Sequence, residues 1–189
     1  RDTAETQIKL DFCVDGTGVS TISTGIGFFD HMLTLFSKHG KFDFELTCNG
    51  DLEVDCHHPV EDVGIVLGQA FREALGDKKG IERYGSGSFP MDETLVNVAL
   101  DFSGRPFLEY HGPSHLPNIG GNFNFTLVEE FLRGFTFNAL INLHVDVVRG
   151  RDPHHISEAI FKGLARSLDR ASVIDPRIAD QIPSTKDLL

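Results

Sequence analysis

The sequence predicts an α+β fold in which a unit of β-hairpin, helix, strand and helix occurs twice, with helices packed on one face of a sheet. Three observations predict this fold class. Short segments alternate between apolar and polar side chains, longer segments with helical periodicity lie between them, and the pattern HHxxE occurs at 57–61 and again at 154–158. The 189 residues are expected to form a single domain, 1–189, which is long enough to bury a substantial core.

Turn and cap residues define the expected elements of the first half. Asp15-Gly16 supplies the turn of a hairpin, Gly40 and Gly76 each end a helix, and Asn49-Gly50 turns one strand into another. In order, we expect a hairpin over 6–23, a helix over 28–39, a strand over 41–48 with its return strand through Val54, and a helix from Pro59 to Leu75.

The second half is expected to follow the same order. The segment 94–102 alternates, and the residues Ser103 to Pro106 turn it into a second strand that ends at His111. The remaining expected elements are a helix over 126–140, a strand over 141–148, a helix over 156–171, and a proline-containing tail.

A shift of 97 residues aligns the two halves. It places His57, His58 and Glu61 on the second HHxxE pattern, and Phe44, Leu46 and Cys48 on Ile141, Leu143 and Val145. Two amphipathic helices align by chance because they share a period, but chance does not readily repeat HHxxE. We therefore predict two pseudo-repeats, about 1–85 and 86–175, followed by a tail over 176–189.

Charge and composition exclude several classes of function. The chain has 17 Lys and Arg against 28 Asp and Glu, a net charge of −11, which argues against binding to nucleic acid or to an anionic membrane. No apolar run approaches the roughly 18 residues of a membrane span. Three cysteines without CxxC spacing indicate a reducing compartment, which we expect to be the cytoplasm, or a plastid for a plant protein whose transit segment was removed.

Nine histidines in so acidic a chain point to metal chemistry. Helical spacing brings Glu61 onto one face with either His57 or His58, whereas adjacent histidines diverge by about 100° and would bind different metals. A single HHxxE is more often a solvated helix start; its repetition favours two metal ions instead. His31 is a further donor, and a gapped alignment matches it to Glu130. Carboxylate ligands without thiolates favour Mn²⁺ over Fe, Zn or Ni.

The few basic residues indicate an anionic substrate. Individually each is more often a solvated surface charge, but as a set bordering the metal site they can hold a phosphate group. The candidates are Arg83, Arg105, Lys162, Ser184 and Lys186. His111 and His144 are interpreted as ordinary surface histidines, and the role of His115 stays open.

The chain resembles the imidazoleglycerol-phosphate dehydratase family. The segments that carry the resemblance occur in order across nearly the whole chain: RDTAETQI, GFFDHML, DCHHPVEDVGI, RYGS, PMDETL, DFSGRPFLEY, HHISEAIFKGLAR and IPSTK. The resemblance implies a ribosomal protein S5 domain 2-like duplicated fold and dehydration of D-erythro-imidazole glycerol phosphate to imidazole acetol phosphate in histidine biosynthesis. It also implies a homo-oligomer of 24 subunits with two Mn²⁺ per active site at subunit interfaces.

The resemblance also implies roles for particular residues. The implied metal ligands are His31, His57, His58, Glu61, Glu130, His154, His155 and Glu158, although many relatives have His where this chain has Glu130. The implied acid–base residues are Glu5, His39 and Asp92, and the five candidates above would meet the phosphate. Glu158 can hardly be both ligand and base, so we favour Glu5 as the group that moves the carbon proton.

The expected chemistry follows from the substrate. The hydrogen that leaves is weakly acidic, and metal bound to the imidazole nitrogens favours an imidazolate that expels the neighbouring hydroxyl through a diazafulvene-like intermediate. Two alternatives share the HHxxE sites. One is another dinuclear metal enzyme, such as a phosphate-ester hydrolase, and the other is a non-catalytic assembly in which metal bridges subunits.

Overall fold

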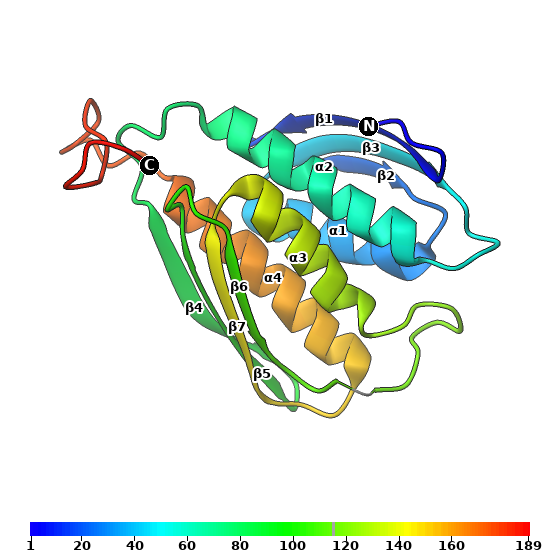
Figure 1. Cartoon of the computed structure of the whole chain (residues 1–189). Helices are drawn as coiled ribbons and strands as arrows, with labels where there is room; N and C mark the ends of the chain where they lie inside the picture. The colour runs from blue at the N-terminus through cyan, green and yellow to red at the C-terminus, as the bar shows by residue number, and fades with distance from the viewer. Residues whose placement is uncertain (115) are drawn as a thin grey trace.

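The computed structural model describes residues 1–114 and 116–189, in which four helices lie between two separate sheets (Figure 1). His115 lies outside the described residues. The α+β class and the duplicated unit are confirmed, and each sheet has helices on one face only. Helices α1 and α2 contact the first sheet, whereas α3 and α4 contact the second. Within the described residues, no helix is both long and apolar enough to cross a membrane.

The first sheet is not built from the expected hairpin. Its strand order is β1-β3-β2, with β3 antiparallel to β1 and parallel to β2. The Asp43 carboxylate of β3 accepts hydrogen bonds from the backbone N–H of Thr17 and Val19, both at 2.8 Å, and so holds the β1–β2 loop across the sheet. The elements are β1 (Thr6–Cys13), β2 (Ser20–Ser23), α1 (Gly27–Gly40), β3 (Asp43–Gly50) and α2 (His57–Leu75).

The return strand expected through Val54 is also wrong. Residues 51–56 form turns that connect β3 to α2, closed by hydrogen bonds from Leu52 to Gly50 and from Val54 to Asp51. The chain must run from the end of β3 to the start of α2 in six residues, which leaves no room for a paired strand. As a result α2 begins at His57, two residues before the expected Pro59.

The second sheet contains a strand that the sequence does not predict. Its order is β4-β5-β7-β6, so β7 separates β5 from β6 and the hairpin expected from these two is wrong. The additional strand β4 lies at the edge and pairs antiparallel with β5. The elements are β4 (Tyr84–Met91), β5 (Thr94–Asp101), β6 (Phe107–His111), α3 (Leu127–Ala139), β7 (Asn142–Arg149) and α4 (Pro153–Ser172).

The pairing registers show the duplication directly. In the first sheet Leu46 lies between Leu10 and Ile22, and in the second sheet Leu143 lies between Leu100 and Leu108. The shift of 97 residues relates Leu46 to Leu143. Strands β1, β3 and β2 therefore correspond to β5, β7 and β6, and β4 is the one addition to the second repeat within the described chain.

Close packing brings the N-terminal ends of the four helices together at one end of the molecule (Figure 1). The ring of Phe28, at the start of α1, lies 5.0 Å from Phe123 and 5.1 Å from His154 between centroids. The Cys56 thiol, at the start of α2, lies 3.6 Å from the backbone oxygen of Asn122. Because both HHxxE patterns lie in the first turns of α2 and α4, this packing gathers the predicted ligands at that end.

Candidate metal centre and phosphate site

Helices α1 and α4 bring three predicted ligands into one cluster. His31 Nε2 lies 3.2 Å from Glu158 Oε1, and His154 Nε2 lies 3.0 Å from the same oxygen. One ligand atom from each of the three residues lies within 4.8 Å of the others. In residues 1–114 and 116–189 no other group of three His, Cys, Asp or Glu residues meets that separation.

The Glu158 carboxylate is buried but ionised. Burial alone would raise its pKa, but hydrogen bonds from Lys162, His31 and His154 outweigh it and hold the pKa at about 2. Lys162 Nζ donates to Oε2 at 2.5 Å, which leaves Oε1 to the two imidazoles. Two imidazole nitrogens and one ionised carboxylate are a donor set that suits a divalent transition metal such as Mn²⁺. The residues present therefore fit such an ion.

The first HHxxE pattern makes a looser arrangement. His57 Nε2 lies 3.6 Å from Glu61 Oε2 across one helical turn. Glu130, which the repeat matches to His31, lies on α3 with its Oε2 3.9 Å from the guanidinium of Arg133. Helices α2 and α3 pack closely here, since a Cβ on Gly134 would lie 2.8 Å from the backbone oxygen of Glu61. The residue that the repeat provides at this pattern is the carboxylate Glu130 instead of an imidazole, and two carboxylates brought close together would repel each other unless a cation lay between them.

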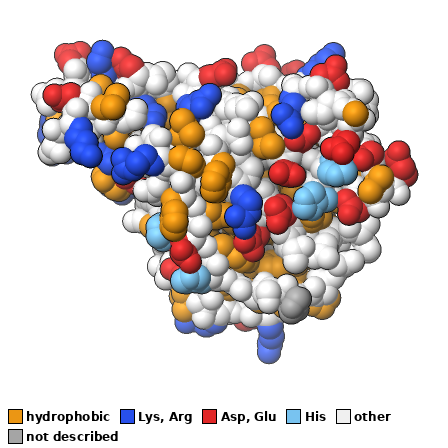
Figure 2. All heavy atoms as spheres, in the orientation of Figure 1, with side chains coloured by type: hydrophobic (Ala, Val, Ile, Leu, Met, Phe, Trp, Pro, Cys, Tyr) orange, Lys and Arg blue, Asp and Glu red, His pale blue; other side chains and the backbone are white. Residues whose placement is uncertain are grey.

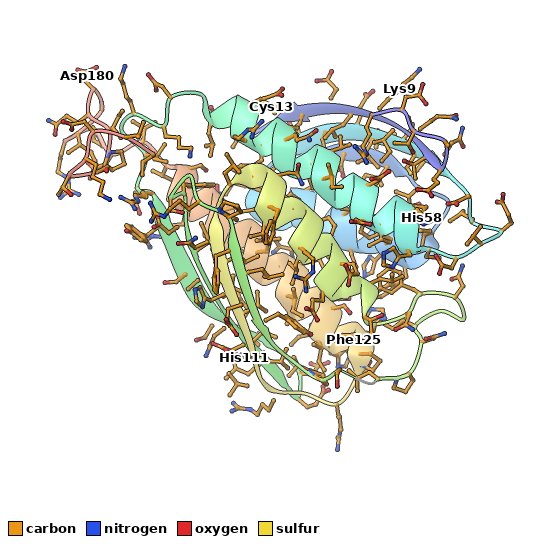
Figure 3. All side chains as sticks on the ribbon, in the orientation of Figure 1. Lys9, Cys13, His58, His111, Phe125 and Asp180 are labelled. Carbon is orange, nitrogen blue, oxygen red and sulfur yellow. The ribbon has the colours of Figure 1, made fainter. Side chains whose placement is uncertain are left out.

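The second histidine of each HHxxE pattern contacts carboxylates outside the pattern instead of the Glu of its own helix. His58 Nδ1 lies 2.9 Å from Asp51 Oδ2 and its Nε2 lies 3.8 Å from Glu5 Oε1 (Figure 3 labels His58). His155 Nδ1 lies 2.8 Å from Glu93 Oε2 and its Nε2 lies 3.8 Å from Asp92 Oδ2. The hydrogen bond to the neighbouring carboxylate raises the pKa of His58 and of His155.

Two of the acid–base candidates therefore lie beside histidines that are predicted metal ligands, His58 and His155. Glu5 and Asp92 are both exposed; Glu5 faces Nε2 of His58 in the first pattern, and Asp92 faces Nε2 of His155 in the second. The third candidate, His39, is half-buried on α1, two turns after His31. Burial lowers the pKa of His39, and the positive charges of Lys162 and Arg166 lower it further. His39 is thus favoured in its neutral form.

Four of the five phosphate candidates line one hollow of about 480 Å³ between the tail and the start of β4. They are Arg83, Arg105, Ser184 and Lys186. The Arg83 guanidinium donates two hydrogen bonds to the Asp101 carboxylate, at 2.6 and 3.0 Å, and a third to the backbone oxygen of Pro183 at 2.8 Å. The fifth candidate, Lys162, contacts Glu158 in the cluster of His31, His154 and Glu158 and is not among the residues that line this hollow.

The hollow and the metal cluster lie at opposite ends of the molecule. In Figure 3 the tail residue Asp180 lies at the upper left and the helix-start residue His58 lies on the right side of the molecule. In Figure 2, Asp, Glu and His side chains gather where α2 begins, whereas Lys and Arg side chains stand among Asp and Glu side chains over the tail. A single chain therefore does not bring these cationic residues to the predicted metal ligands.

Sequence reasoning missed Asp51 and Glu93. Neither lies within the HHxxE patterns, and their contacts join segments seven and 62 residues apart in the chain. Glu93 follows Asp92 directly and Asp51 follows the Asn49-Gly50 pair, but no spacing rule relates either residue to a histidine. Only the folded arrangement of the β4–β5 turn and the loop after β3 identifies them.

Comparison with known proteins agrees with these features. A family model described as imidazoleglycerol-phosphate dehydratase matches residues 24–168. The chain is 56% identical over 189 residues to the protein of that name from Acetivibrio thermocellus, covering 100% of this chain and 96% of the relative. It is 54% identical over 189 residues to the one from Azorhizobium caulinodans, covering 100% and 95%.

Two crystal structures of proteins with that name are similar to this one. The Staphylococcus aureus structure has a TM-score of 0.83 at 41% identity, covering 89% of this chain and 95% of that one. The Pyrococcus furiosus structure, in complex with (S)-C348, has a TM-score of 0.84 at 33% identity, covering 100% and 99%.

Proposed function

The chain belongs to the imidazoleglycerol-phosphate dehydratase family, and we propose that its two HHxxE patterns hold two Mn²⁺ ions that its reaction requires. Family membership makes the protein a hydro-lyase of histidine biosynthesis, which converts imidazole glycerol phosphate into imidazole acetol phosphate. The observation that carries the metal proposal is the cluster of His31, His154 and Glu158, whose ligand atoms already converge.

The other predicted ligands would complete the coordination of the two proposed ions. Besides the cluster residues, the proposed ligands are His57, His58, Glu61, Glu130 and His155. Bound metal supplies Lewis acidity toward the imidazole ring and fixes its orientation. The site around the first HHxxE pattern would contain a larger share of carboxylate than the site around the second, because Glu130 of α3 stands there in the position that His31 of α1 takes at the second pattern.

The acid–base steps are assigned to groups that lie beside these histidines. We assign removal of the proton on carbon to the carboxylate of Glu5, which is exposed and lies 3.8 Å from His58 Nε2. The protonated form of His39, which its lowered pKa makes a stronger acid, is the proposed donor to the departing hydroxyl. Asp92 is the alternative to Glu5, because it faces His155 in the way that Glu5 faces His58. A general acid or base contributes about 10²–10⁴-fold to a rate.

The phosphate group is proposed to bind in the hollow beside the tail, against Arg83, Arg105, Ser184 and Lys186. Their guanidinium, hydroxyl and ammonium groups are the donors that phosphate oxygens prefer. Lys162 would meet the substrate from the side of the metal cluster instead.

An active site of this composition needs more than one copy of the chain. The proposed phosphate residues and the proposed ligands lie at opposite ends of one molecule, while the substrate is small (Figure 3). We therefore propose a homo-oligomer, of 24 subunits as the family resemblance implies, in which one subunit's tail meets another subunit's metal ligands. Three free cysteines fit a reducing compartment, and we propose the cytoplasm.

Metal analysis combined with a dehydratase assay tests the proposal. The purified chain is freed of metal by chelation and then assayed for water loss from imidazole glycerol phosphate with and without added Mn²⁺. We expect two Mn²⁺ per subunit and activity that returns with the metal. The same samples are assayed for phosphate release, which a phosphate-ester hydrolase would catalyse. Full activity of the metal-free chain, or no activity with metal bound, would contradict the proposal.

A further inference from the structure

The second histidines of the two HHxxE patterns lie in matching environments that the sequence repeat does not explain. Each imidazole has a carboxylate at Nδ1, at 2.9 Å for His58 and 2.8 Å for His155. Each also has Nε2 directed toward a different, exposed carboxylate at 3.8 Å. In both cases Nδ1 is in hydrogen-bond contact whereas Nε2 lies beyond hydrogen-bond distance of its carboxylate.

The two Nδ1 partners come from non-equivalent parts of the repeats. Asp51 follows β3, and the shift of 97 residues would match it to Val148 within β7. Glu93 lies in the turn between β5 and β4, the strand that the first repeat lacks. The same contact has therefore been built twice from unrelated segments. A contact inherited passively from duplication would instead use matching positions.

In each pair one carboxylate oxygen is engaged by the histidine, but the other oxygen differs in its surroundings. Glu93 Oε1 accepts hydrogen bonds from the backbone N–H of Arg151 at 3.3 Å and of Asp152 at 3.0 Å, which leaves Oε2 for His155. Asp51 is largely buried, and its Oδ1 has no hydrogen-bond partner, so Oδ2 alone is engaged, by His58. Neither carboxylate is available to bind a metal ion through the oxygen that faces the histidine.

We propose that Asp51 and Glu93 are positioning residues that hold the Nδ1–H tautomer of His58 and His155 and present Nε2 to metal. A carboxylate accepts a hydrogen bond and cannot donate one when ionised, so Nδ1 carries the proton and the lone pair of a neutral imidazole lies on Nε2. Partners of this kind orient ligand histidines, and their loss typically costs about 10–100-fold in metal affinity or activity. The inference rests on the proposed metal-dependent function.

A third histidine–carboxylate pair provides a matched control. His111 Nε2 lies 2.8 Å from Glu109 Oε1, close to the 2.9 and 2.8 Å of the proposed pairs, but this pair is exposed on β6. Its Nδ1 lies 3.1 Å from Asp146, so both ring nitrogens face carboxylates at hydrogen-bond distance. Removing Glu109 therefore removes an equivalent contact away from the helix starts.

Three variants separate positioning from support of the fold. Asp51→Ala removes the acceptor for His58, and Glu109→Ala is its control. Glu93→Gln keeps Oε1 for the two backbone N–H groups, and those donors fix the amide so that its NH₂ faces His155 Nδ1. An amide donor at that position forces Nδ1 to accept, which moves the proton to Nε2 and blocks the lone pair.

The test is Mn²⁺ binding to the full-length, metal-freed proteins, followed through the electron paramagnetic resonance signal of free Mn²⁺, together with thermal unfolding of the metal-free proteins. We expect Asp51→Ala and Glu93→Gln each to weaken binding at one of the two sites by about 10–100-fold. Glu109→Ala is expected to bind like wild type, and metal-free Glu93→Gln to unfold within a few degrees of wild type.

The possible outcomes distinguish this inference from the function on which it rests. Wild type that binds no Mn²⁺ overturns both. Wild type that binds, with Asp51→Ala and Glu93→Gln binding as tightly as Glu109→Ala, overturns the positioning role alone. Weakened binding in Glu93→Gln accompanied by an equally large loss of metal-free stability also overturns it, because a purely structural role for Glu93 would then account for both changes.

Discussion

Replacing Lys162 by methionine tests how the buried charge of Glu158 is balanced before metal binds. The Glu158 side chain is 9% exposed and the Lys162 side chain 21%, and the two are joined by a hydrogen bond of 2.5 Å. Removing one partner of a buried ion pair costs about 3–5 kcal/mol, since the other charge stays buried. Glu158 retains His31 and His154 at Oε1, and hydrogen bonds to a charged group contribute about 1.5–3 kcal/mol each.

The retained imidazoles should reduce the loss below the range for an isolated pair, to about 2 kcal/mol of unfolding free energy. For a chain of this size, 1 kcal/mol corresponds to about 2–4 °C, so the midpoint of thermal unfolding should fall by about 4–8 °C. The measurement is calorimetry of metal-free wild type and Lys162→Met at matched protein concentration. If Glu158 binds Mn²⁺ as proposed, excess metal gives it a cationic partner in both proteins, and the difference should shrink to less than half.

The pair of Lys41 and Asp169 supplies the control. It also joins the end of α1 to α4, with a separation of 2.9 Å, but the Lys41 side chain is 60% exposed. An exposed pair contributes about 0–1 kcal/mol, so Lys41→Met should change the midpoint little and should not respond to Mn²⁺. Equal losses in the two variants, or a Lys162→Met loss that Mn²⁺ leaves unchanged, would refute the charge-balance reasoning.

Three further predictions concern the chemistry of the site. Glu5→Gln should keep its metal content by elemental analysis but lower turnover by about 10²-fold or more, and wild-type turnover would remove Glu5 from the mechanism. Lys186→Ala should raise KM for the substrate by about 10-fold, measured beside Lys79→Ala as the control, because a charged hydrogen bond to phosphate is lost. Burial lowers the pKa of folded His39, so the unfolded chain takes up a proton that the folded chain excludes, and stability should fall as pH drops below 6.5 toward that lower pKa. Thermal unfolding of metal-free His39→Gln should show a weaker loss between pH 7 and 5.5, and parallel curves would contradict this assignment.

Helix positions could be read from the sequence because their signals are local. The predicted 28–39 helix differs from α1 by one residue at each end, and Gly76, with φ +57°, ends α2 as expected. The end of α1 differs from the expectation: Gly40 lies inside the helix, where a Cβ would lie 2.1 Å from the Phe42 ring, and Lys41 takes the left-handed conformation instead.

Strand pairing could not be read in the same way. A turn such as Asp15-Gly16 brings two strands near each other, but whether they pair or admit a third strand depends on segments far along the chain. Strand β4 was missed because its glycines and proline do not alternate as a half-buried strand should. Gly85 is required there, since a Cβ would lie 1.9 Å from the backbone oxygen of Ser167 on α4.

The predicted ligands differ in how far one chain assembles them, and the difference follows from the residue that faces each Glu of an HHxxE pattern. In the second pattern, Glu158 meets His31, and an imidazole approaches a carboxylate without a cation between them. In the first, the matching position holds Glu130, which lies beside Arg133 instead. Two carboxylates brought close together repel unless a cation lies between them, so the proposed metal should order the ligands around the first pattern more than those around the second. The duplication thus gives two similar frameworks, and if both bind metal as proposed, the one that has a carboxylate in place of the imidazole should depend more on its ion to bring the ligands together.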